Sequence, residues 1–317
     1  MHVYIPKSFP VLLLSLCLLW TSSGSAMTRT LQPDPAIVLV AFGTTTKARA
    51  TYDVFEKQLR SELPEQYQSY PIEWAFTSEI VRERANRAFA EQGLNKRFLS
   101  LPQVLANLEN QGYRKVVVQP LHIFPGQEYM DVQKVIAAFE QIGLRISSGG
   151  TLMHEWPWVH ETLAALEPYF LAPGEGCNIL AAHGTPETFA GSNTAYLGLE
   201  KYLATHYQNV FVGCVEGILP REQTMQQVLS CPTNKVRLIP FMYVAGDHIM
   251  NDIMGQEADE DGNLSWAMEL QKNKFNVDIP TVSYQGETYF KGLGFYPEIN
   301  QRFIEQILEN IEKLEKL

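Results

Sequence analysis

The sequence is short of cysteine. Its 317 residues contain four cysteines, and none belongs to a Cys-x-x-Cys pair, which disfavours a zinc site made of thiolates. Only Cys177, Cys214 and Cys231 lie after the first 26 residues. The chain without those 26 residues can therefore form at most one disulfide, with one thiol left over. The alternative is that all three are small buried hydrophobic residues.

The sequence is also short of positive charge. It has 25 Lys and Arg residues against 35 Asp and Glu residues, a formal net charge of -10. The first 26 residues hold one Lys and no acid, so the chain without them carries -10 - 1 = -11. Nucleic acids and anionic membrane surfaces require a basic footprint, so we expect neither as a partner.

Long apolar runs are absent after the first 26 residues. Within that segment, Lys7 precedes the run "FPVLLLSLCLLW", and "SSGSA" ends with the small residue Ala26. This order is typical of an export signal, and the run is shorter than the roughly 20 residues that span a bilayer. We expect residues 1–26 to be a signal peptide cleaved after Ala26, and the mature protein to be periplasmic with no membrane span.

Two common catalytic motifs are missing. Neither the Walker pattern nor Gly-x-Ser-x-Gly occurs, which disfavours a P-loop nucleotide site and a serine hydrolase. The segment "FGTTT", which begins at Phe42, is suited to an anion held by backbone N–H groups and hydroxyls at a helix start. A two-lobed anion receptor is therefore one hypothesis that the residues leave open.

Short apolar runs alternate with segments of helical periodicity, which predicts parallel sheets with helical crossovers. We expect an α/β fold of two similar lobes, each a parallel sheet flanked by helices, with an N-terminal lobe at 27–150 and a C-terminal lobe at 151–317. The predicted strands are 36–42, 72–78, 115–124, 209–217 and 235–244, together with the first part of 177–185, which then becomes a loop. The predicted helices are 51–63, 101–112, 193–206, 221–230 and 298–317.

The two halves repeat one another. "AIVLVAFGTT" matches "CNILAAHGTP", and "VVVQPLHIFPGQEYMD" matches "VRLIPFMYVAGDHIMN". The matching loops differ at three positions: where the first half has Phe42, Ser78 and Glu128, the second has His183, Glu216 and His248. The second half has therefore gathered two imidazoles and a carboxylate at the ends of its strands.

These three residues suit a divalent transition metal. The carboxyl ends of parallel strands meet at one edge of a sheet, so we expect the three side chains to converge there. Two His and one Glu leave coordination positions open, as a catalytic or metal-transferring site requires. Taken singly, each has a structural alternative, which is a hydrogen-bonded His at a strand end for His183 and a surface pair with Asp247 for His248.

The other histidines give weaker signals. His122 lies at a strand end of the first half near Glu128, and we predict that it lines the same cleft and contacts a cofactor, with a core histidine as the alternative. His154 and His160 flank "EWPW" and are assigned to packing, and His206 is assigned to solvent.

With "AFGTTT", "AFTSEIV", "PLHIFPGQEY", "AAHGT", "CVEG" and "PFMYVAGDHIMND" in this order, the mature chain resembles the anaerobic cobaltochelatases of cobalamin biosynthesis. These are class II chelatases, similar in fold to protoporphyrin ferrochelatase. The resemblance implies two α/β lobes across a cleft and ATP-independent insertion of Co(II) into sirohydrochlorin, a tetrapyrrole with many carboxylates. It also implies that His183, Glu216 and His248 are the metal-binding and catalytic residues.

The chemistry of insertion assigns further roles. His183 is the expected proton acceptor, because imidazole titrates near neutral pH. Arg82, Arg84 and Lys47 are candidates to offset the substrate's negative charge. Phe295 stands where related sequences often have an acid, which removes a polar contact.

Several alternatives stay open at this point. The predicted export is unusual because cobalamin assembly is cytoplasmic, and an exported carrier for a metal, haem or another tetrapyrrole is the second hypothesis. The choice between Co, Fe and Ni and the oligomeric state, a homo-oligomer included, are not set by the sequence.

Overall fold

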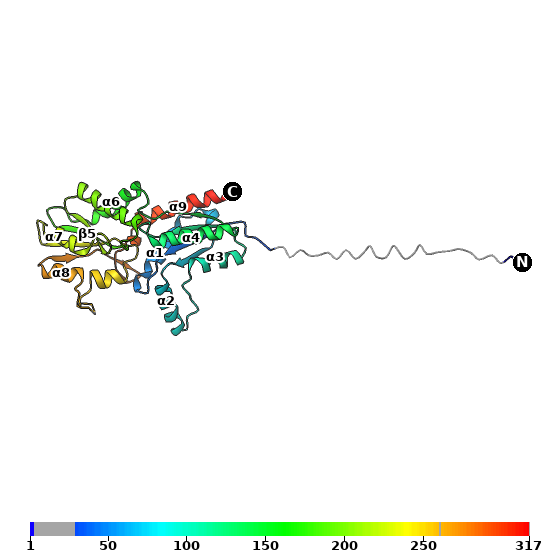
Figure 1. Ribbon diagram of the computed structural model, residues 1–317, viewed down its shortest axis with the longest axis horizontal. Coiled ribbons are helices and arrows are strands. Elements are labelled where there is room, and N and C mark those ends of the chain that lie inside the picture. The colour runs from blue at the N-terminus through cyan, green and yellow to red at the C-terminus, as the bar shows by residue number, and fades with distance from the viewer. Residues whose placement is uncertain (3–28, 260, 317) are drawn as a thin grey trace.

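The computed structural model describes residues 1–2, 29–259 and 261–316. The predicted signal peptide and its cleavage point at Ala26 lie almost entirely outside the described residues. Figure 1 shows helices α1–α4 grouped on one side of the molecule and α6–α8 around β5 on the other. None of the helices in the described ranges combines the length and apolarity needed to cross a bilayer.

Each half of the chain forms a parallel sheet of four strands. The first sheet has the order β2-β1-β3-β4, and the second has the equivalent order β6-β5-β7-β8. The α/β fold with two similar parallel sheets is therefore confirmed. The strands are β1 (Ala36–Ala41), β2 (Ile72–Phe76), β3 (Lys115–Pro120), β4 (Arg145–Ser148), β5 (Cys177–Gly184), β6 (Val210–Glu216), β7 (Lys235–Pro240) and β8 (Asn276–Asp278).

The crossovers between strands are mostly helical, as parallel pairing requires. Their amphipathic faces cover the sheets, whose central strands β1 and β5 are almost wholly buried. The helices are α1 (Ala50–Glu62), α2 (Glu79–Glu91), α3 (Leu101–Asn110), α4 (Gln127–Gln141), α5 (Trp156–Leu166), α6 (Ala190–His206), α7 (Arg221–Val228), α8 (Trp266–Lys272) and α9 (Pro297–Glu315). Short 3₁₀ turns are η1 (Lys47–Arg49), η2 (Glu65–Tyr67), η3 (Glu167–Tyr169) and η5 (Leu293–Phe295), and η4 (Ile249–Ile253) is a single π-helical turn.

Two predicted strands are too long. The runs at 115–124 and 235–244 were both predicted to be extended throughout, but β3 ends at Pro120 and β7 at Pro240. Proline has no N–H to continue a ladder, so each chain leaves the sheet and enters a loop. An antiparallel hairpin of β9 (Thr281–Tyr284) and β10 (Glu287–Phe290) was not predicted at all.

The last helix ties the halves together. The predicted apolar stripe of α9 is confirmed, because Ile299, Phe303, Ile304 and Ile307 are fully or almost fully buried. This helix comes from the second half of the chain but packs against β3, β4 and α1, and Figure 1 shows it beside the first-half helices. The division of the chain at residue 150 therefore stays a prediction.

One disulfide joins two segments of the second half. Cys177, at the start of β5, is bonded to Cys231, in the connection before β7, and Cys214 is a buried free thiol. Of the two possibilities that the sequence left open, the structure therefore shows the disulfide with one remaining thiol, and only Cys214 is a small buried residue with a free thiol. Burial raises the pKa of the Cys214 thiol to about 12, so it is neutral at physiological pH.

Candidate active site

The candidate site lies at the carboxyl edge of the second sheet, where β5 and β6 end side by side. Gly184, the last residue of β5, pairs with Glu216, the last residue of β6. Gly184 has φ +89°, and a Cβ atom added to it would lie 1.7 Å from the carbonyl oxygen of Glu216. Only glycine fits this position, so the backbone itself brings the His183 and Glu216 loops into contact.

The structure brings the two predicted histidines together. The rings of His183 and His248 have centroids 4.6 Å apart and stand at 77° to each other. The Nδ1 atom of His183 lies 3.6 Å from Oε1 of Glu216, and both side chains are between two-fifths and one-half exposed. Three residues from distant parts of the second half therefore share one accessible location.

Both imidazoles have an acceptor beside Nδ1. His183 Nδ1 lies 3.1 Å from the carbonyl oxygen of Gly184, and His248 Nδ1 lies 2.7 Å from Oδ2 of Asp252. A ring that donates from Nδ1 keeps the lone pair on Nε2, which is the atom that a metal would bind. The protein's own hydrogen bonds thus favour the ligating tautomer of each histidine.

Asp252 also lies at the candidate site and was not predicted from the sequence. It follows His248 by four residues and lies on the same turn of η4, so its carboxylate contacts the ring directly. The spacing His-x-x-x-Asp at the end of a predicted strand was a usable signal, because residues four apart share one face of a helix. A carboxylate behind a metal-binding histidine fixes the ring and raises its basicity.

The loops of the first half face this edge. A Cβ atom added to Gly246, two residues before His248, would lie 3.0 Å from Oγ1 of Thr44. Phe42 is 44% exposed, and its ring centroid lies 6.4 Å from that of His183. The residue that replaces histidine in the first half therefore sits next to the histidine of the second half.

The other two first-half counterparts serve their helices. The hydroxyl of Ser78 accepts a hydrogen bond from the N–H of Val81 and caps α2, and Glu128 lies in the first turn of α4. In the "FGTTT" loop, Oγ1 of Thr46 accepts from the N–H of Ala48, so that hydroxyl caps η1.

His183, Glu216 and His248 do not form a closed metal cage. Within the part of the chain that the structure describes, no group of three or more His, Cys, Asp and Glu side chains is arranged to hold an ion already. The arrangement offers two Nε2 lone pairs and a nearby carboxylate on an accessible surface. Such a set suits a metal that arrives and leaves, more than one that is held permanently.

His122, the predicted cofactor contact, is partly buried, with both ring nitrogens turned away from solvent. Neither ring nitrogen is accessible or has a hydrogen-bond partner among the described residues. Burial lowers the pKa of His122 to about 4, so the ring is neutral at physiological pH. A role in cofactor binding stays a prediction, and it requires a movement that exposes one nitrogen.

Two of the cations proposed to meet the substrate already have protein partners. Lys47 donates from Nζ to the carbonyl oxygen of Thr288, 2.9 Å away in the β9–β10 hairpin. Arg82 donates to the carbonyl oxygens of Phe76 and Thr77, each at 2.7 Å, and so closes the end of β2. Arg84 is exposed.

Phe295, which was expected to remove a polar contact near the cleft, is buried. Its ring lies against Tyr284 and Tyr289 of the hairpin. An aromatic side chain at this position therefore packs the hairpin onto η5.

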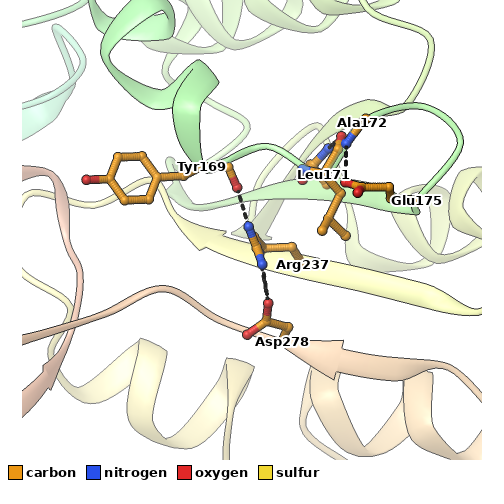
Figure 2. A network of polar contacts seen from close by, with 7 residues as sticks. Tyr169, Leu171, Ala172, Glu175, Arg237 and Asp278 are labelled. Atoms are coloured by element: carbon orange, nitrogen blue, oxygen red, sulfur yellow. Dashed lines mark hydrogen bonds and ion pairs between the residues drawn. The ribbon is translucent and has the colours of Figure 1, made fainter.

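A second polar cluster lies at the opposite edge of the second sheet, near the start of β5 (Figure 2). Arg237 donates to the carbonyl oxygen of Tyr169 at 2.8 Å and from Nε to Asp278 at 2.9 Å, and Glu175 accepts from the N–H of Ala172. These groups satisfy one another, so the cluster fastens η3 and β8 to β7. A surface cavity beside it is lined by Glu167, Glu175, His206 and Tyr207, and it does not reach the candidate site.

Comparison with known proteins gives one consistent result. A family model described as cobalt chelatase (CbiK) matches residues 35–312. The sirohydrochlorin cobaltochelatase CbiKC of Nitratidesulfovibrio vulgaris is 28% identical over 260 residues, which cover 79% of this chain and 85% of that protein. The sirohydrochlorin cobaltochelatase of Salmonella typhimurium is 26% identical over 275 residues, which cover 85% and 93%.

Solved structures agree on the fold. SirB from Bacillus subtilis, determined with Fe3+, aligns with a TM-score of 0.55 and 14% identity over 89% of this chain and 98% of that one. The sirohydrochlorin chelatase SirB from the subspecies spizizenii, determined with cobalt, aligns with a TM-score of 0.54 and 15% identity over 88% and 96%. The chain therefore has a chelatase-like fold.

Proposed function

The chain belongs to the CbiK cobalt chelatase family, and on that premise we propose that it inserts Co(II) into sirohydrochlorin, with the metal held by His183, Glu216 and His248. The observation that carries the metal site is the pair of imidazoles 4.6 Å apart, each with an acceptor at Nδ1 that leaves Nε2 for the ion. Glu216 adds a negative charge that offsets the charge of the arriving cation.

Metal insertion exchanges one Co2+ for two protons. As the metal leaves Nε2 of His183 for the pyrrole nitrogens, that nitrogen regains its lone pair and accepts one of the protons released from the macrocycle. Glu216, 3.6 Å from Nδ1 of the same ring, stabilises the imidazolium that forms. Exposure of both side chains lets the second proton pass to water.

The test is anaerobic insertion of Co(II) into sirohydrochlorin, followed by absorbance. We expect turnover by the unmodified protein and a fall in rate of about 100-fold or more in His183→Ala and His248→Ala, since loss of a ligand should cost at least as much as loss of its supporting residue. His206→Ala, at the exposed end of α6, is the matched control and should keep the full rate. A reaction that is no faster with the protein present than with it absent, or full activity in both site variants, would refute the proposal.

An exported carrier is the second candidate, and the Cys177–Cys231 disulfide favours export because disulfides persist in oxidising compartments. In this form the mature periplasmic protein begins at Met27 and binds a metal or tetrapyrrole, haem included, without releasing product. N-terminal sequencing of the protein recovered from the periplasm tests the processing. Repeated turnover with substrate in excess over protein separates the enzyme from the carrier.

A further inference from the structure

Tyr196 is a buried residue of α6 whose hydroxyl touches the His183 loop. Its side chain is 4% exposed, and its Oη accepts a hydrogen bond from the N–H of Gly184 at 3.1 Å. This backbone N–H is thus bonded to a side chain of α6 and not to a neighbouring strand, so the end of β5 relies on Tyr196 for that contact.

The Gly184 peptide has little freedom to move. Its carbonyl oxygen lies 3.1 Å from His183 Nδ1, and its Cα faces the backbone of Glu216 so closely that no side chain fits. The N–H that bonds Tyr196 belongs to the His183–Gly184 peptide, and the carbonyl beside His183 Nδ1 belongs to the next peptide, so the peptide groups on both sides of the Gly184 Cα are held, and Gly184 also pairs with Glu216. A shift of either group would move the His183 ring and its distance to Glu216 together.

The other face of Tyr196 meets the first half of the chain. Its ring stacks on Phe124 with centroids 3.8 Å apart and an angle of 26°. Phe124 lies between β3 and α4, in the loop that follows the first sheet, and it also contacts Phe241 after β7. The side chain of Tyr196 thus contacts both the first half of the chain, at Phe124, and the backbone next to His183.

Tyr196 is suited to a neutral structural role. Burial, with the negative charge of Glu216 nearby, raises the pKa of Tyr196 well above its ordinary value. The phenol therefore stays protonated, which avoids a second negative charge behind Glu216.

We propose that Tyr196 is a positioning residue that sets the His183 ring for the metal by holding Gly184, and that it transmits the Phe124 contact from the first lobe to that ring. This inference rests on the proposed metal site.

The experiment titrates the full chain with Co(II) alone, anaerobically, and records the ligand-field absorption of the bound ion. Tyr196→Phe keeps the stack on Phe124 but leaves the N–H of Gly184 without its acceptor. We expect the Co(II) dissociation constant to rise about 10- to 100-fold, as for other supporting residues of metal-binding histidines, and the absorption bands to shift. A residue with only a packing role would leave both unchanged.

Tyr243→Phe is the matched control. Tyr243 is equally buried, and its hydroxyl donates to Oδ1 of Asn300 at 3.0 Å, with no contact to the His183 loop. This variant should lose stability to a similar extent and bind Co(II) with the original constant and spectrum.

Phe124→Leu tests the same idea from the first lobe and also serves if Tyr196→Phe fails to fold. It removes the stack and keeps the hydrogen bond, so a smaller shift in the same direction is expected. Suppose that the unmodified protein binds Co(II) and that Tyr196→Phe binds it with an unchanged dissociation constant and spectrum. The positioning role is then wrong while the metal site stands. If Tyr196→Phe does not fold, the same result with Phe124→Leu leads to the same conclusion. Absence of Co(II) binding by the unmodified protein would remove both.

Discussion

His122 is a single residue that should make stability depend on pH. Its folded-state pKa is about 4 because the ring is buried, against about 6.5 in an unfolded chain. Between these values the unfolded state binds a proton that the folded state does not. The contribution of His122 to the free energy of unfolding is therefore fully present above pH 6.5. It is lost as the pH drops toward 4, by up to about 3 kcal/mol.

The test is His122→Met, which places at this position the residue found at the equivalent Met242. Denaturant unfolding at pH 7, 5.5 and 4 should show a smaller loss of stability at low pH in the variant than in the unmodified protein. His206→Met, at an exposed position, should keep the original pH dependence. If His122→Met lost as much stability between pH 7 and pH 4 as the unmodified protein, His122 would not be the source of the pH dependence.

At this scale the internal repeat was the informative signal. It selected His183, Glu216 and His248 because each replaces a different residue in the first half, and the structure places them together. Tyr196 could not be found in this way, because its role depends on a hydrogen bond to a backbone group twelve residues away across a loop. Lys47 was expected at the substrate but reaches the hairpin, whose existence the sequence did not reveal.

At the scale of elements, the close approach of the ends of β5 and β6 depends on one residue, Gly184. Its φ of +89° and the 1.7 Å approach to Glu216 mean that alanine would be both strained and obstructed. Gly143 is a matched control, because its φ is +101° and a Cβ there would meet nothing within 4 Å. Comparing the two variants separates the conformational cost from the steric cost.

We expect Gly143→Ala to lower the free energy of unfolding by about 1 kcal/mol, the cost of a left-handed conformation for a residue with a side chain. Gly184→Ala should lower it by more than about 3 kcal/mol, since the β5 and β6 ends must move apart. Denaturant midpoints provide the comparison. Equal losses in the two variants would show that the Glu216 backbone yields without cost.

Elements with a strong local pattern were predicted closely, and those without were missed. The run at 36–42 and the stripe at 298–317 became β1 and α9 with shifts of one or two residues. By contrast, β8 has three residues and lies at a sheet edge, so it shows neither a continuous apolar run nor a clear alternation. The ends of β3 and β7 were readable in principle from Pro120 and Pro240.

At the scale of the whole molecule, the largest buried apolar cluster crosses both halves. It includes Leu39 of β1, Leu180 of β5 and Phe303 of α9. The ring of Phe303 contacts Phe55 of α1 and Tyr243 of the second half. Local sequence patterns could not reveal this, because the stripe on α9 says that the helix is buried without saying against which sheet.

A core shared in this way predicts that the two halves unfold together. Trp74 lies in the first sheet and Trp266 in a cluster confined to the second half, so variants that keep only one of these tryptophans report on each half. Their fluorescence transitions in denaturant should coincide.

Phe303→Ala should cost about 3–5 kcal/mol, as truncation of a buried aromatic does. It should move both transitions by the same amount, because the helix that carries Phe303 belongs to both cores. Leu270→Ala, within the second-half cluster, is the control for a truncation that does not touch α9. If Phe303→Ala moved only the Trp74 transition, the halves would be independent domains, and the contact between Phe124 and Tyr196 would be too weak to couple the first lobe to the metal-binding edge.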